Sequence, residues 1–121
     1  MGFNMKKLMS FAVALAGLFV CSCSNSSAAF PEDCLKFETP SGKTLQVACI
    51  FHGSLAFEYD GTVIQVDPVT QMGDMKIDYS AFAKADAIFI THSHQDHLCA
   101  EALDLLSDDK TRLYANAESV S

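Results

Sequence analysis

The alternation of apolar and polar residues predicts three consecutive β-strands, over 44–51, 54–59 and 62–66. In 44–51 every second residue is apolar (Leu45, Val47, Cys49 and Phe51), so these side chains share one side of a strand. Asp60-Gly61 separates the second and third strands and predicts a hairpin turn, because glycine tolerates the positive φ that such turns need.

The second half of the chain predicts strands separated by a helix. The apolar run 87–90 lies between polar neighbours, which is typical of a buried strand. Helix-forming residues with leucines on one face predict a helix over 100–106. A further strand is predicted over 111–115.

The connecting segments give weaker signals. Asp78 is placed to cap a short helix over 79–84, and Asn116 is a candidate cap for a helix whose body is absent. Prolines or a glycine predict irregular backbone over 30–43 and a loop over 69–77.

The first 29 residues are typical of a secretory signal followed by a tether. Lys6 and Lys7 precede an apolar run over 8–20, which is shorter than the roughly 20 residues that a membrane-spanning helix needs. Val20-Cys21-Ser22-Cys23 resembles a bacterial lipoprotein box, in which Cys23 becomes the lipidated first residue. Ordinary cleavage near Ala28 or Ala29 is the alternative.

We therefore expect a signal and tether over 1–29 and a folded domain over 30–121, exported to the bacterial periplasm or anchored there as a lipoprotein. Membrane contact would come only through a lipid on Cys23. The chain is 50% hydrophobic and 19% charged, as in globular proteins. Its net charge of −7 and its scattered basic residues argue against nucleic acid as a partner.

The cysteines outside the signal leave alternatives open. Export would permit a Cys34–Cys49 disulfide; the alternative is that both residues are free, with Cys49 buried in its strand. Cys99 follows the histidines and is either a further metal ligand or a buried residue at the start of a helix.

Three of the four histidines fall in one short loop after the predicted strand 87–90. His92, His94 and His97 form the pattern H-x-H-x-D-H together with Asp96. Imidazole nitrogen and carboxylate oxygen are favoured ligands of zinc and similar ions. The loop is therefore a candidate metal site.

This loop resembles the metal-binding motif of the metallo-β-lactamase superfamily. The resemblance covers about residues 45–121 and includes the strand hairpin, Val66-Asp67-Pro68 and the apolar strand before the motif. It implies an α+β fold, the N-terminal half of an αββα sandwich. Phe51-His52-Gly53-Ser54 looks similar to the ascorbate-6-phosphate lactonase-like branch.

The resemblance implies a hydrolase with two divalent metal ions, with zinc as the default and manganese or iron as alternatives. His92 and His94 would bind the first ion, and Asp96 and His97 would bind the second. Hydroxide held by the two ions would attack an ester, lactone, amide or phosphodiester of a small-molecule substrate. Asp96 would thus be both a ligand and the candidate catalytic residue.

Two residues outside the motif are further candidates. Asp67 either orients a ligand histidine from its strand end or simply ends the strand before proline. His52 either lines the pocket and contacts substrate or is a structural loop histidine.

The resemblance also implies ligands that this chain does not contain. The family takes two further histidines and a bridging aspartate from sequence well beyond the motif, whereas 24 residues without a histidine follow His97. We therefore expect an N-terminal fragment of a longer hydrolase, inactive by itself and of open oligomeric state. The alternative is an exported, non-catalytic metal-binding lipoprotein, for which only Cys99 is available as a fourth ligand.

Overall fold

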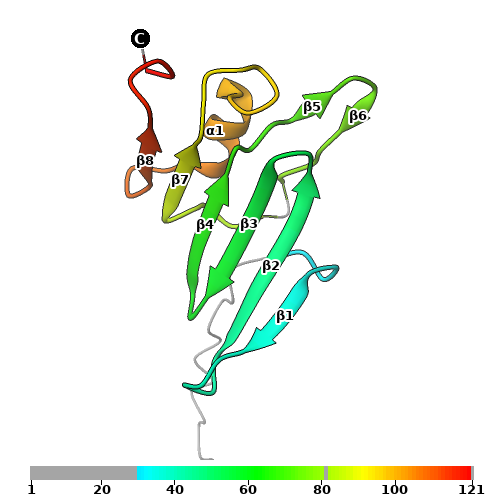
Figure 1. Cartoon of the computed structure of the whole chain (residues 1–121), viewed down its shortest axis with the longest axis vertical. Coiled ribbons are helices and arrows are strands. Elements are labelled where there is room, and N and C mark those ends of the chain that lie inside the picture. The colour runs from blue at the N-terminus through cyan, green and yellow to red at the C-terminus, as the bar shows by residue number, and fades with distance from the viewer. Residues whose placement is uncertain (1–29, 81, 121) are drawn as a thin grey trace, which may run out of the picture.

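Six strands form one mixed sheet in the computed structural model, which describes residues 30–80 and 82–120 (Figure 1). The signal predicted over 1–29, with Cys23, lies outside the described residues. In sheet order the strands are β1 (Leu35–Glu38), β2 (Thr44–Phe51), β3 (Ser54–Tyr59), β4 (Thr62–Val66), β7 (Ala87–Ile90) and β8 (Arg112–Ala115). Strands β1 to β4 pair antiparallel, whereas β4, β7 and β8 are parallel. A small hairpin of β5 (Gln71–Met72) and β6 (Met75–Lys76) and the helix α1 (Ala100–Leu106) complete the described elements.

The predicted α+β class is confirmed, together with most of its elements. Strands β2, β3, β4 and β7 and helix α1 have the predicted bounds, and β8 begins one residue later than predicted. Asp60 and Gly61 join β3 to β4 with φ angles of 53° and 81°, the left-handed backbone expected of that turn. Among the described residues, no helix has the length and apolar character needed to cross a membrane.

Two segments that we predicted as irregular contain short strands. Residues 35–38 form β1 by pairing with β2, from Leu35 opposite Val47 to Glu38 opposite Thr44. The predicted loop 69–77 contains the β5–β6 hairpin, with Gly73 at a φ of 57° in its turn. Both pairs depend on a partner strand, which a local sequence pattern does not reveal.

The predicted helix over 79–84 is wrong in the described part of that segment. The Ser80 N–H does donate to Asp78 Oδ1 over 2.8 Å, and the Phe82 N–H donates to the Tyr79 carbonyl over 3.0 Å, but the result is a single turn. Tyr79 is 2% exposed and packs edge-on against Phe82. A helix this short has little stability of its own, so burial of the two rings decides the local conformation.

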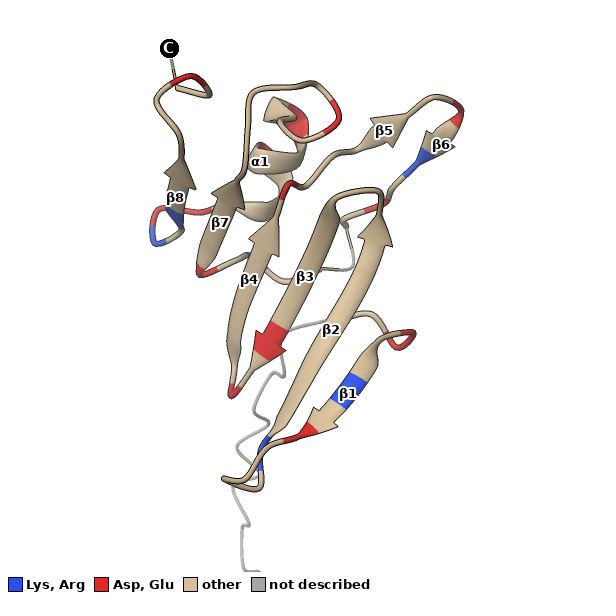
Figure 2. Ribbon diagram, in the orientation of Figure 1, with Lys and Arg blue, Asp and Glu red and all other residues tan. Residues whose placement is uncertain are grey.

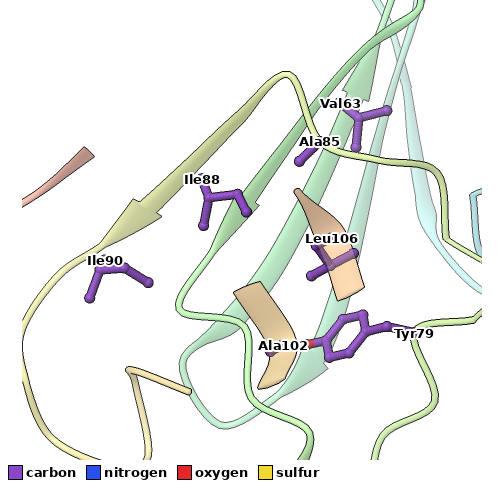
Figure 3. Packing of buried hydrophobic residues seen from close by; sticks show 7 residues of the cluster. All are labelled: Val63, Tyr79, Ala85, Ile88, Ile90, Ala102 and Leu106. Atoms are coloured by element: carbon purple, nitrogen blue, oxygen red, sulfur yellow. The ribbon is translucent and has the colours of Figure 1, made fainter. Parts of the chain in front are cut away.

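The hydrophobic core lies between α1 and one face of the sheet (Figure 3). Val63 from β4 and Ile88 and Ile90 from β7 are buried on this face, and Ala102 and Leu106 from α1 are buried against it. Because α1 connects the parallel strands β7 and β8, it crosses back over the sheet and covers this face. The core therefore fixes β4, which is followed by Asp67, and β7, which is followed by the loop that contains the predicted metal ligands.

The opposite face of the sheet is apolar and partly exposed. Its strand registers set Val66, Phe89 and Tyr114 side by side. Phe89 and Tyr114 stack with ring centroids 4.7 Å apart, yet they are 39% and 46% exposed. Figure 2 shows the acidic and basic residues mainly in turns and at strand ends. One helix layer and one sheet layer are thus present, as in the first half of an αββα sandwich.

Of the two alternatives for Cys34 and Cys49, the structure shows the second, since both cysteines are free. Cys34 Sγ lies 3.5 Å from Gln46 Oε1. Side chains alternate along β2, so Gln46 and Cys49 point to opposite faces of the sheet. Cys49 is also exposed rather than buried, because its face is the one that α1 does not cover.

Candidate metal centre

The predicted site residues come from three segments that meet at one edge of the sheet. His52 lies in the turn between β2 and β3, Asp67 directly follows β4, and the loop 91–97 directly follows β7. Because β4 and β7 are parallel neighbours, their carboxyl ends open to the same edge, where the β2–β3 turn also lies (Figure 1). Residues distant in sequence are thereby brought together.

The four histidine rings converge at this edge. The centroids of His92 and His97 are 3.9 Å apart, those of His92 and His94 are 4.6 Å apart, and those of His52 and His97 are 5.1 Å apart. The side chain of His97 is 16% exposed, whereas that of His52 is 48% exposed. The cluster is therefore mostly buried at His97 and open to solvent at His52.

Asp96 belongs to two overlapping groups of candidate ligands. His92, His94 and Asp96 form one group, and His52, Asp96 and His97 form the other. In each group the ligand atoms lie within 4.8 Å of one another. These nitrogen and carboxylate donors fit zinc and related divalent ions. The structure thus brings together all four predicted ligands and adds His52 to them.

Asp67 connects β4, β7 and the histidine loop through its buried carboxylate. Oδ1 accepts the backbone N–H of Thr91 over 2.7 Å, and Oδ2 accepts the Thr91 hydroxyl over 2.6 Å. Oδ2 also lies 2.7 Å from His97 Nδ1. With Nδ1 engaged in this way, Nε2 is the free ring nitrogen of His97, and it lies 3.7 Å from Asp96 Oδ2.

The backbone of Asp67, like its carboxylate, is held by hydrogen bonds to neighbouring segments. Its φ is 44°, an uncommon value for a residue other than glycine. Its N–H donates to the Phe89 carbonyl over 2.9 Å, and its carbonyl accepts the Ser54 hydroxyl over 2.5 Å. The sequence identified Asp67 as a candidate but gave no role to Thr91 or Ser54, because these contacts depend on how the strands pack.

The two aspartates are both biased toward the charged form. Burial acts to raise the pKa of Asp67, but the hydrogen bonds from Thr91 and His97 outweigh it and hold that pKa below its ordinary value. The pKa of Asp96 is also lowered, first by its own backbone N–H and then by electrostatic interaction with the rings of His97, His52 and His94. Both groups are therefore carboxylates at neutral pH, as metal binding requires.

Gly53 is a site residue that the sequence did not reveal. A Cβ built on Gly53 would lie 2.8 Å from His97 Cε1 and 3.0 Å from His97 Nδ1. The His97 ring therefore packs directly on the backbone of the β2–β3 turn, at a distance that only glycine permits. The His-Gly dipeptide between two strands was the only local signal of this contact.

Gly53→Ala is expected to displace the His97 ring and weaken zinc binding by about 10- to 100-fold, the range seen when support for a ligand is lost. Titration calorimetry of the chain with zinc would measure this change. Gly42→Ala is the matched control, because Gly42 has a φ of 77° but no atom within 4 Å of an added Cβ. It should lower stability and leave zinc affinity unchanged. Equal zinc affinity in Gly53→Ala and the wild type would contradict the contact.

Cys99 is the residue that begins α1, as one of the two alternatives predicted. It occupies the N-cap position and packs against the core, with Sγ 3.4 Å from Thr70 Oγ1. Neither candidate ligand group in the described part of the chain contains it. Burial acts to raise its pKa, but hydrogen bonds from Thr70 and the first backbone N–H groups of α1 lower the pKa overall.

Comparison with known proteins agrees with this geometry. A protein of Parabacteroides distasonis ATCC 8503, provisionally named a metal-dependent hydrolase, has a crystal structure that is 44% identical in sequence, with a TM-score of 0.65. The match covers 71% of this chain and 37% of that one. Among curated proteins, none matches. The family described as the beta-lactamase superfamily domain matches residues 46–118, more than half of the chain. The chain therefore belongs to the β-lactamase superfamily.

Proposed function

We propose that this chain is the metal-binding part of a metal-dependent hydrolase that acts on a small-molecule ester, lactone, amide or phosphodiester. The observation that carries the proposal is the pair of ligand groups that share Asp96 at the edge of the sheet. Membership of the β-lactamase superfamily and the name of the solved relative support the same reaction class.

The side-chain positions support the proposed roles. His92 and His94 hold one divalent ion, and Asp96 and His97 hold a second. Zinc is the first choice, with manganese or iron as alternatives. Such ions supply hydroxide near neutral pH and stabilise negative charge on the reacting oxygen. Asp67 fixes the tautomer and the orientation of His97, so that its Nε2 faces Asp96.

The chain spans 37% of the length of the solved relative, so the activity of the whole protein belongs to the proposal. We propose that further ligands and the opposite wall of the pocket come from additional sequence in the natural protein. A divalent ion in a catalytic site needs three protein ligands in a fixed geometry, and a two-metal site needs this twice. The 121-residue chain should therefore bind metal without turning over substrate.

The test compares this chain with a natural longer form that contains it. Both are stripped with a chelator, reloaded with zinc, manganese or iron(II), and assayed with an ester, a lactone, a β-lactam amide and a phosphodiester. We expect the longer form to hydrolyse at least one substrate, and a metal to restore this activity after chelation. The double variant His92→Ala, His94→Ala should not recover.

Hydrolysis that resists the chelator would contradict the proposal, as would failure of both forms to bind a metal. Metal binding without hydrolysis by the longer form would instead favour the non-catalytic metal-binding protein. Chelator-sensitive turnover by the 121-residue chain itself would show that it completes the site without additional sequence.

A further inference from the structure

His52 faces the metal ligands from a separate strand turn. Its Nε2 lies 3.2 Å from Asp96 Oδ2, closer than the 3.7 Å between His97 Nε2 and the same oxygen. Its ring meets that of His97 edge-on, with centroids 5.1 Å apart. His52 thus directs a ring nitrogen at the carboxylate that belongs to both ligand groups.

The backbone holds His52 in this position. The β2–β3 turn contains only His52 and Gly53, between Phe51 and Ser54, which pair with each other. His52 has a φ of 50°, a conformation uncommon for a residue with a side chain. The Ser54 hydroxyl bonds to the Asp67 carbonyl, and the ring of His97 packs on Gly53. The turn is therefore held in place by its contacts with Asp67 and with the ring of His97.

The two ligand groups share Asp96, so the group that uses it has three ligands and the other keeps only two. His52, Asp96 and His97 supply two imidazoles and a carboxylate, the three-ligand set that leaves one position of a zinc ion open. If Asp96 serves this group, His92 and His94 are the members that remain in the other group. The first group therefore offers the more complete site within this chain.

We infer that His52 is a direct ligand of the ion held by Asp96 and His97, rather than a substrate-contacting residue, and that this ion binds first. The inference rests on the proposed function, because it assumes that the motif holds divalent metal. It adds a third ligand, from the β2–β3 turn, to the two that the motif itself provides. The first equivalent of zinc should accordingly occupy a site that spans β2, β3 and the loop after β7.

The test is a zinc titration of the 121-residue chain, followed by long-range ¹H–¹⁵N spectra of the histidine rings. The spectra are assigned with His52→Asn and His94→Asn. Asparagine tolerates the left-handed backbone at position 52, so the turn is retained. We expect the first equivalent of zinc to shift the ring nitrogens of His52 and His97 to metal-bound values before those of His92 and His94. His52→Asn should weaken this first binding by about 10-fold or more. Asp60→Asn, which changes a residue of positive φ in the β3–β4 turn outside both ligand groups, should leave it unchanged.

Three results would overturn the inference. The first is an initial shift at His92 and His94 without His52. The second is unchanged affinity for the first ion in His52→Asn. The third is weaker binding in His52→Asn without a metal-bound resonance for His52 in the wild type, which would make His52 a positioning residue for Asp96. All three leave the metal-binding motif intact, whereas absence of zinc binding by the wild type would remove the proposed function as well.

Discussion

Asp96→Ala is expected to weaken zinc binding by more than about 100-fold and to reduce the number of bound ions. Loss of groups that merely support a ligand lowers metal affinity by about 10- to 100-fold, so loss of a direct ligand should exceed that range. Asp96 is the member common to both ligand groups, and it is the carboxylate in each. Titration calorimetry and metal analysis after gel filtration would measure affinity and stoichiometry.

Asp96→Asn separates charge from shape, because the amide retains the size of the side chain and loses its negative charge. It should bind zinc more weakly than the wild type. Asp74→Ala, which removes an exposed aspartate in the β5–β6 turn, is the matched control and should behave like the wild type. Two tightly bound zinc ions in Asp96→Ala would show that neither site depends on this carboxylate.

Asp67→Ala is expected to lower both stability and zinc affinity. Its removal leaves the Thr91 N–H, the Thr91 hydroxyl and His97 Nδ1 without their acceptor at a partly buried position. We expect a decrease of roughly 2–4 kcal/mol in the free energy of unfolding. With His97 no longer oriented, zinc affinity should fall by about 10- to 100-fold. Urea unfolding of the metal-free chain and zinc titration would measure the two effects.

Asp67→Asn provides the sharper test of the role of His97. Both oxygens of Asp67 accept hydrogen bonds, so either orientation of an amide places an NH₂ group where an acceptor is needed. An amide that donates to His97 Nδ1 would move the ring proton to Nε2, the nitrogen intended for the metal. Zinc affinity should therefore fall although the shape is kept. Asp78→Asn is the control, since Asp78 bonds to Ser80 outside the site. Normal zinc binding in Asp67→Asn, with the His97 proton shown by ¹H–¹⁵N spectra to lie on Nε2 in the metal-free variant, would rule out control of the tautomer.

The sequence predicted the strands and the helix whose signals are local. Alternation in 44–51, the Asp60-Gly61 turn and the apolar run 87–90 each set an element by neighbouring residues alone. The missed strand Leu35–Glu38 has only four residues and exists through its pairing with β2. The predicted helix at 79–84 failed because burial of Tyr79 outweighed a capping signal from Asp78.

In the candidate site too, local sequence patterns identified some residues, whereas other contacts depend on how distant segments pack. His92, His94, Asp96 and His97 lie in one loop, so spacing alone identified them. The contact of His52 with Asp96 and the packing of His97 on Gly53 depend on the β2–β3 turn meeting the loop after β7. The sequence named His52 and Asp67 as candidates with two interpretations each, and only the strand order showed which atoms they face.

Selection for thermal stability alone would tend to erase this site. Of the three described non-glycine residues with positive φ, His52 and Asp67 face the ligands, and Asp60 lies in the β3–β4 turn. Such a backbone costs about 1–2 kcal/mol relative to glycine. At Asp60 a library could recover that energy without touching the histidines. At His52 the same gain would remove a side chain that faces the ligands. Directed evolution of this protein should therefore screen for retained metal alongside heat resistance.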